Sequence, residues 1–330
     1  MNLCTSNCLA CGKCAGLPVL DSFHMAARNA EKRDGYGIAV DLGTTTVAMA
    51  LLDLSSGRVT ARHSFLNPQR AFGADVISRS RAADEGHQEE LRRVIREAVT
   101  EGISRLFTGQ ADDVCVAGNT VMTRLFPALP GERVLPCLSE LIGGDILAGL
   151  LYVLPEGVGR FLLIDLGTNG EMALYDNGKL TLTSAAAGPA FEREGKGASN
   201  VIEECASLLR QGLIGKTGTH KTRDLQLAKS AVRAGVELLV GDTPLDAVYL
   251  AGGIGQAIAP EDAVTVGLLP PELGRKAHPV GNASLGGAVR LLLEPKAAER
   301  DMERLQAAAV SINLAEHPAF SDLFMRHIDF

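Results

Sequence analysis

The chain contains no tryptophan and few other aromatic residues. Of its 330 residues, four are tyrosine and ten are phenylalanine, so aromatic residues make up 4% of the sequence. Protein-binding surfaces are enriched in aromatic side chains. Their scarcity here, together with 36 glycines and many small aliphatic residues, fits an α/β enzyme better than a protein-binding module.

The chain also lacks an excess of basic residues and any long apolar run. Its net charge of −7 argues against nucleic acid as a partner, because phosphate binding requires a basic surface. No apolar stretch approaches the length that spans a bilayer, and no hydrophobic signal-peptide core follows Met1. We therefore expect a cytoplasmic protein without a membrane partner, long enough for two ordinary domains.

The seven cysteines do not suggest a disulfide framework, since the chain is large and shows no export signal. Four of them are spaced C-x3-C-x2-C-x2-C at Cys4, Cys8, Cys11 and Cys14. Thiolates this close can surround one compact metal centre, and we interpret the motif as a 4Fe–4S site. A four-cysteine zinc site is the alternative, although such sites usually pair two C-x2-C knuckles across a longer loop. Cys115 is expected to be a small core residue.

One pattern occurs twice in the chain. Residues 41–46 read Asp-Leu-Gly-Thr-Thr-Thr, and residues 165–171 read Asp-Leu-Gly-Thr-Asn-Gly-Glu. Each follows an apolar strand-like run and precedes a second strand, a tight turn and a third strand; the turn of the second copy is Asn177-Gly178, a strong hairpin signal. The repeat predicts two related half-domains, each with an acidic, glycine-rich corner.

Other segments follow the periodicities of an α/β fold. Residues 88–107 carry apolar side chains at three- and four-residue steps and predict a helix. A second long helix is predicted over residues 223–240, and the tail after Pro295 is expected to be helical. The apolar side of the helix over residues 223–240 is predicted to consist of Leu225, Leu227, Ala228, Ala231, Val232, Gly235, Val236 and Leu239. We expect a cluster segment over residues 1–20, a linker over 21–35, and half-domains over 36–158 and 159–330, with the C-terminal helices able to pack back on the first half.

The duplicated corners have the chemistry of a phosphate clamp. Backbone N–H groups around the glycine can face an anion, and threonine hydroxyls add donors. The carboxylates of Asp41 and Asp165 can bind Mg²⁺ through water. The predicted phosphate-binding residues are Gly43, Thr44, Thr45, Thr46, Gly167, Thr168, Asn169 and Gly170.

Six further residues belong to the predicted site. Asn119 follows a buried strand and precedes a helix, a common place for ligand contact. The glycines Gly252, Gly253 and Gly255 follow another buried strand and let a ring or phosphate approach the backbone. Asp145 either caps a helix or orients the attacking water. Glu171 either performs that water-orienting role or is a solvated strand-edge carboxylate.

Together these motifs resemble the superfamily of acetate and sugar kinases, heat-shock chaperone ATPases and actin. Residues 41–46 match its first phosphate motif, 165–171 the second and 251–255 the adenosine motif. Within it, the chain is similar to the reductive activators of corrinoid proteins. The stretches that carry this narrower likeness are residues 165–171, 186–192, 224–229, 249–253 and 281–283.

The resemblance implies a fold and an activity. The fold would be two duplicated actin- or hexokinase-like (ribonuclease H-like) α/β half-domains with an ATP cleft. ATP or ADP with Mg²⁺ would bind there, and the 4Fe–4S cluster would pass an electron from a donor such as ferredoxin to Co(II) in a corrinoid protein. The short cysteine motif takes the place of the ferredoxin-like front domain that such activators often carry. Four cysteines suffice for a cluster within one chain, so a homodimer is compatible but not required.

Three other functions fit parts of the sequence. An ATP-dependent activator of another low-potential enzyme, such as a dehydratase, would keep both cluster and ATPase. A small-molecule kinase would use the phosphate corners but not the cysteines. An ATP-binding regulator with a zinc knuckle would keep the fold without electron transfer.

Overall fold

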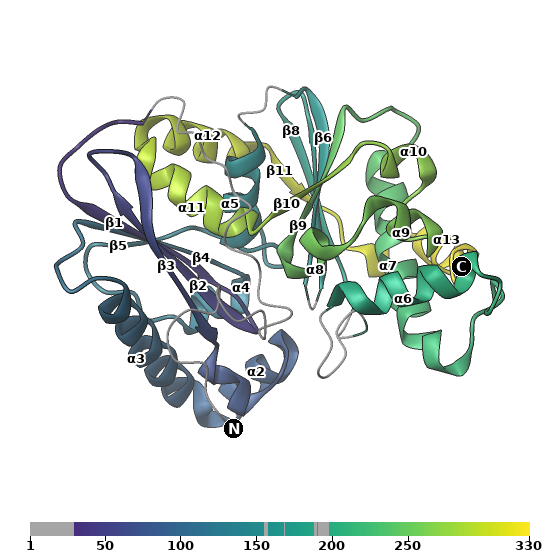
Figure 1. Cartoon of the computed structure of the whole chain (residues 1–330), viewed down its shortest axis with the longest axis horizontal. Helices are drawn as coiled ribbons and strands as arrows, with labels where there is room; N and C mark the ends of the chain where they lie inside the picture. Colours follow the sequence, from purple (N-terminus) through teal and green to yellow (C-terminus); the bar gives the residue numbers. More distant parts are fainter. Residues whose placement is uncertain (1–29, 155–157, 168, 188–189, 191–197) are drawn as a thin grey trace. The chain divides into compact units, whose positions relative to one another are not determined.

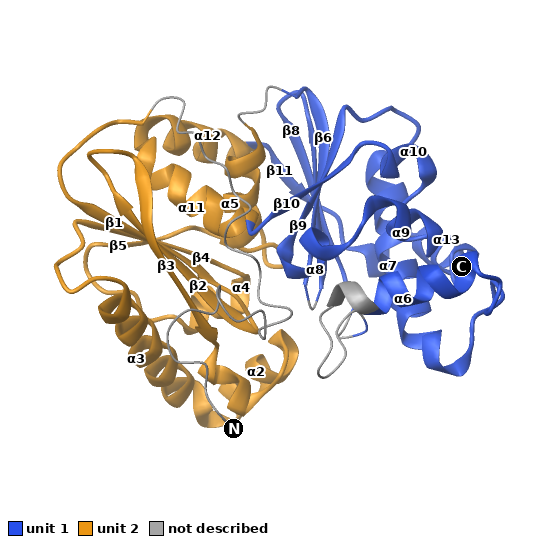
Figure 2. Ribbon diagram, viewed as in Figure 1, with its two compact units in different colours: residues 1–22, 156–282, 308–330 blue, residues 23–155, 283–307 orange. Residues whose placement is uncertain are grey.

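A computed structural model of the chain describes residues 30–154, 158–167, 169–187, 190 and 198–330. These residues form two compact units, which Figure 2 colours separately. Unit 2 contains the described residues up to 154 together with residues 283–307; unit 1 contains those of 158–282 and 308–330. Each unit is therefore assembled from segments that are distant in sequence.

Unit 2 is built on a five-stranded mixed sheet of order β3-β2-β1-β4-β5 (Figure 1). β1 to β3 form an antiparallel meander, while β4 and β5 run parallel to β1. The turn between β2 and β3 contains Gly57 with φ +70°, a conformation that favours glycine. The strands are β1 (Tyr36–Leu42), β2 (Thr46–Asp53), β3 (Arg58–Leu66), β4 (Asp113–Gly118) and β5 (Glu132–Val134).

The helices of unit 2 come from both of its chain segments. The helix predicted over residues 88–107 is confirmed as α3, which buries Leu91, Ile95 and Val99. The helical elements are η2 (Pro68–Phe72), α2 (Val76–Ala82), η3 (Ala83–His87), α3 (Gln88–Leu106), α4 (Thr120–Leu125), α5 (Gly144–Val153), α11 (Ala283–Leu293) and α12 (Pro295–Ala308).

Unit 1 holds a six-stranded sheet of order β10-β9-β6-β7-β8-β11. Its strands are β6 (Arg160–Leu166), β7 (Gly170–Asp176), β8 (Lys179–Ala185), β9 (Ala247–Ala251), β10 (Ala277–Gly281) and β11 (Ala309–Ser311). Its helices are α6 (Ala198–Arg210), η6 (His220–Thr222), α7 (Arg223–Val240), α8 (Gly252–Ala257), α9 (Pro260–Thr265), α10 (Pro271–Gly274), η7 (Leu314–Glu316) and α13 (Phe320–Arg326).

The two sheets share one topology. Strands β3-β2-β1-β4-β5 of unit 2 and β8-β7-β6-β9-β10 of unit 1 follow the same order, with an antiparallel meander and two parallel strands in each. The predicted hairpin turn is confirmed at Asn177 and Gly178, which have φ values of 47° and 97°. The predicted α/β class is therefore confirmed. None of the described helices combines the length and apolarity that crossing a bilayer demands.

Two details of unit 1 differ from the prediction. Leu227 is 37% exposed, so it does not belong to the buried side of α7. The buried side of α7 instead includes Lys229, whose amine donates to the backbone carbonyls of His327 and Asp329 and lies 5.5 Å from the centre of the Phe330 ring. The tail after Pro295 is not wholly helical, because β11 pairs with β8 in parallel.

The helices α5 and α11 of unit 2 approach each other closely at a glycine. A Cβ atom added to Gly287 of α11 would lie 1.8 Å from the carbonyl oxygen of Ala148 in α5. A backbone atom cannot move aside as a flexible side chain can. This contact therefore requires glycine for steric reasons.

We predict that Gly287→Ala lowers the free energy of unfolding by about 3 kcal/mol, the upper end of the usual cost of overpacking. Gly215→Ala is the matched control, because nothing lies within 4 Å of a Cβ added there. Urea denaturation of the two variants checks this. Equal free energies of unfolding for the two variants would contradict the prediction, because α5 and α11 could then move apart without loss of stability.

Candidate functional site

The corner predicted at residues 41–46 lies in unit 2 where β1 ends. Asp41 is flanked by Ala48 of antiparallel β2 and Ala117 of parallel β4. Gly43 leads into the loop, and a Cβ atom there would lie 2.5 Å from the carbonyl oxygen of Thr46, the first residue of β2. The tight hairpin therefore needs glycine at position 43.

Asn119 lies beside this corner, because β4 runs parallel to β1 and Gly118 pairs with Leu42. The Oδ1 atom of Asn119 caps α4 by accepting the N–H of Met122 at 3.0 Å. Its Nδ2 atom donates to the Thr44 hydroxyl at 2.9 Å. The structure thus brings together two residues that were predicted separately from motifs 75 positions apart.

Asp145 belongs to the same corner, and its interpretation as a helix cap is wrong. The N-cap of α5 is Gly143, and the Asp145 carboxylate accepts the N–H of the next residue, Ile146, at 2.9 Å. A Cβ atom on Gly143 would lie 2.4 Å from Asn119 Cα and 2.7 Å from Asp145 Oδ1, so glycine permits this close approach. Burial raises the pKa of the Asp145 carboxyl to about 7, and the neighbouring charge of Asp41 adds to the rise.

Ser284 is a site residue that the sequence analysis missed. It lies in the first turn of α11, is 4% exposed, and donates its hydroxyl to Asp41 Oδ1 at 2.8 Å. The two residues are 243 positions apart in sequence. The available signal was the adjacent 281–283 motif, which ends one residue before Ser284.

The second corner lies in unit 1 where β6 ends. Asp165 is flanked by Glu171 of antiparallel β7 and by Ala251 of parallel β9. Gly252 has φ +80°, and a Cβ atom there would lie 2.4 Å from Asp165 Oδ1. The first glycine of the adenosine motif therefore lies directly against the acidic residue of the corner.

The remaining predicted residues of this corner occupy short, tight elements. Gly167 donates its N–H to the carbonyl of Asn169 at 2.9 Å, while Gly170 starts β7 against Val232 of α7. Gly253 and Gly255 lie in α8. Thr168 lies outside the described residues.

Glu171 has a regular strand position. It pairs with Ser184 of β8 as well as with Asp165, and it is half-buried. Its predicted roles, in orienting water or as a solvated carboxylate, stay predictions.

The four cysteines of the predicted cluster, Cys4, Cys8, Cys11 and Cys14, also lie outside the described residues. Within the described ranges, no three His, Cys, Asp or Glu side chains are grouped to hold a metal. Cys115 is fully buried, as predicted, and burial raises the pKa of its thiol to about 12. Burial likewise raises the pKa of Cys205 to about 11.

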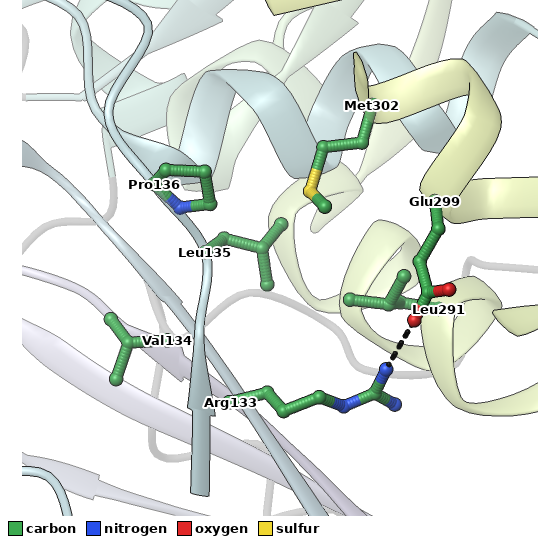
Figure 3. Close-up of a pocket in the computed structure, with 7 residues that line it drawn as sticks. All are labelled: Arg133, Val134, Leu135, Pro136, Leu291, Glu299 and Met302. Atoms are coloured by element: carbon green, nitrogen blue, oxygen red, sulfur yellow. Dashed lines mark hydrogen bonds and ion pairs between the residues drawn. The ribbon is translucent and has the colours of Figure 1, made fainter.

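Two pockets lie outside the corners. One, of about 270 Å³, lies in unit 2 between the β5 segment and helices α11 and α12 (Figure 3). Its lining is largely apolar apart from Arg133 and Glu299, and Arg133 donates to Glu299 at 3.1 Å. Such a lining does not suit a polyphosphate, and no predicted site residue contributes to it.

The other pocket, of about 650 Å³, lies in unit 1. Two stretches that carry the narrower family resemblance meet there: Ala186 and Ala187 from one, and Asp224, Leu225 and Ala228 from the other. These two motifs therefore share one location in the fold.

Comparison with known proteins places these features in one family. The model described as the RACo middle region matches residues 36–134. The model described as the C-terminal domain of RACo, the ASKHA domain, matches residues 160–203 and 218–330. The two matches together include both corners.

Individual relatives agree with the family models. The corrinoid activation enzyme RamQ of Eubacterium limosum is 28% identical over 92% of this chain and 71% of its own length. A Co(II) methylated amine-specific corrinoid protein reductase of Methanosarcina barkeri is 28% identical over a match that covers 48% of this chain and 38% of that protein. A solved reductive activator for a corrinoid, iron–sulfur protein superposes with a TM-score of 0.78 and 28% identity, covering 91% of this chain and 67% of its own.

The raised pKa of Asp145 predicts how stability depends on pH without nucleotide and Mg²⁺. In the folded state the Asp145 carboxyl keeps its proton up to about pH 7, whereas in the unfolded state it releases the proton near pH 3.8. Between these values the folded state binds more protons, so this group's contribution to stability falls as pH rises. We predict that Asp145→Asn, measured against wild type by thermal unfolding, gains stability progressively from about pH 4 to pH 7 and levels off above pH 7. The same exchange at exposed Asp322 is the control, and a gain independent of pH would contradict the assignment.

Proposed function

The chain belongs to the RACo family, the reductive activators of corrinoid proteins, and from that premise we propose that it uses ATP to reduce the Co(II) form of a corrinoid protein to Co(I). The observation that carries the proposal is the likeness to a reductive activator for a corrinoid, iron–sulfur protein over 91% of this chain, with a TM-score of 0.78. The names of the two curated relatives, a corrinoid activation enzyme and a Co(II) corrinoid protein reductase, support the same partner.

The two acidic corners are the proposed nucleotide-binding elements. Each follows the first strand of an equivalent sheet, and each combines an aspartate with a tight glycine-containing turn. We assign the phosphates of ATP to the backbone and hydroxyl donors of residues 43–46 and 167–170. Gly252, which lies against Asp165, would bring the adenosine motif next to the donors of residues 167–170 in the same unit.

The chemistry of the unit 2 corner fits a bound Mg²⁺. Burial raises the pKa of Asp145, and repulsion from the neighbouring charge of Asp41 raises it further. A divalent cation would relieve this repulsion, since carboxylates and water are the ligands that Mg²⁺ prefers. Asp41, oriented by the Ser284 hydroxyl, is the proposed ligand in unit 2 and Asp165 its counterpart in unit 1.

Asp145 is the proposed residue that orients the attacking water. A carboxyl group with a pKa near 7 can accept a proton at neutral pH and return it afterwards. Its carboxylate is fixed by the N–H of Ile146, and Asn119 and Thr44 complete the surroundings. Glu171 on β7 is the alternative residue for this role.

The cysteine motif at the front of the chain supplies the electron-transfer part of the proposal. Four closely spaced thiolates form a donor set that fits a 4Fe–4S cluster, held by Cys4, Cys8, Cys11 and Cys14. When bound, the cluster would accept one electron from a low-potential donor such as ferredoxin and deliver it to Co(II). ATP can drive this transfer only if it binds two states of the protein with different affinity.

Asp165→Asn tests the nucleotide part of the proposal. Loss of one negative charge from the Mg²⁺ site is expected to slow ATP hydrolysis and ATP-dependent Co(I) formation at least about 100-fold. Both rates are measured anaerobically, the second from the absorbance change of the corrinoid protein. Asp242→Asn, at an exposed position of unit 1, is the control. Hydrolysis near the wild-type rate in Asp165→Asn would refute the assignment.

The metal content of anaerobically purified protein tests the cluster. We expect a brown protein with about four irons per chain, and a Cys8→Ser variant that loses iron while keeping ATP hydrolysis. The iron and zinc contents are measured together by inductively coupled plasma mass spectrometry. A colourless protein with one zinc per chain would refute electron transfer and favour a zinc-containing regulator.

A further inference from the structure

Three consecutive carbonyl groups of the unit 2 corner are held by residues behind the loop. The carbonyl of Gly43 accepts Asn67 Nδ2 at 2.9 Å. The carbonyl of Thr44 accepts Arg79 Nη2, and that of Thr45 accepts the backbone N–H of Asn67 at 2.9 Å. Every carbonyl of the connection between β1 and β2 thus has a donor from the η2–α2 region.

The orientation of these carbonyls determines where the following amides point. In a trans peptide group the C=O of one residue and the N–H of the next are coplanar and point in nearly opposite directions. The N–H groups of Thr44, Thr45 and Thr46 therefore face away from Asn67 and Arg79. For Thr44 and Thr45 no protein acceptor is found in the part of the chain that the structure describes. Successive N–H groups on one side of a loop form an anion-binding concavity.

The residues behind the loop are buried and mutually fixed. Asn67 is 1% exposed and Arg79 is 0% exposed. Asn67 caps η2 by accepting the N–H of Gln69 at 3.0 Å, and the guanidinium of Arg79 also donates to the Gly73 carbonyl at 3.0 Å and to Met122 Sδ at 3.2 Å. This arrangement leaves the loop little freedom to turn its amides inward.

Arg79 carries a charge that these contacts do not neutralise. Its acceptors are two carbonyls and a thioether, and among the described residues it forms no ion pair. Burial lowers the pKa of its guanidinium to about 10, so it stays protonated at neutral pH. The charge of Asp75 acts on Arg79 without forming an ion pair with it. A buried cation that no carboxylate pairs with is costly, and an anion bound across the thin loop would compensate for it.

We propose that Asn67 and Arg79 are positioning residues for the phosphate corner of unit 2. They turn the amides of residues 44–46 toward a nucleotide phosphate, and the charge of Arg79 attracts the phosphate through the loop. The inference deepens the proposed function and depends on it only for the identity of the anion.

The test compares binding of ATP, tripolyphosphate and adenosine to Arg79→Met by titration calorimetry. We expect affinity for ATP and tripolyphosphate to fall about tenfold to a hundredfold, the usual effect of losing a charge-assisted contact, with adenosine affinity unchanged. Arg81→Met is the matched control, because Arg81 lies on the same helix but is exposed. Far-UV circular dichroism establishes that the variants are folded.

A second variant covers the case in which Arg79→Met does not fold. Asn67→Asp keeps the oxygen that caps η2 but replaces the Nδ2 donor to Gly43, and about a tenfold loss of tripolyphosphate affinity is expected. Equal loss of adenosine and tripolyphosphate affinity, or no loss of either, would overturn the inference, as would a wild-type protein that does not bind tripolyphosphate. A protein that binds these anions as expected but does not reduce a corrinoid protein would overturn only the proposed function.

Discussion

The geometry of the unit 2 corner depends on the pairing of three backbone carbonyls with donors that lie behind the loop. An amide can point at an anion only when its peptide plane is fixed, and the plane is fixed through the carbonyl on its other side. Asn67 and Arg79 supply these donors, while Gly43 allows the turn to close against Thr46. Two further hydrogen bonds orient side chains of the corner: Ser284 donates to the Asp41 carboxylate, and Asn119 donates to the Thr44 hydroxyl. The proposed phosphate corner is therefore a product of several chain segments rather than of one short motif.

The two corners reach a similar arrangement with different neighbours. In unit 2 a second carboxylate, Asp145, approaches because Gly143 leaves room beside Asn119. In unit 1 the neighbour of Asp165 is a glycine: a Cβ atom on Gly252, the residue after β9, would lie 2.4 Å from Asp165 Oδ1. Shared strand order thus preserves the position of the leading aspartate, while the residues that lie beside it differ between the two units.

Sequence reasoning succeeded where the signal was local. The strand–corner–strand pattern, the apolar face of α3 and the position of Gly252 after β9 are encoded in short stretches, and parallel pairing then brings Asn119 to Thr44. It failed where the contact is long-range. Ser284 resembles any helix-start serine, and Arg79 resembles a solvated helix arginine until the fold buries it. Leu227 was misplaced because α7 buries a lysine against the tail, which hydrophobic periodicity cannot reveal.

The division of the chain between the two units has a consequence for its synthesis. Unit 2 begins near residue 30 but needs α11 and most of α12, whereas all of β6 to β10 lies in unit 1. Proteins emerge from the ribosome with the N-terminal part first, and domains usually fold in that order. Here the earliest sheet must wait for residues 283–307 before Gly287 can pack on α5 and Ser284 can reach Asp41. A chain that stops before residue 283 would therefore hold an unfinished corner, because α11 follows all of β6 to β10 in the sequence.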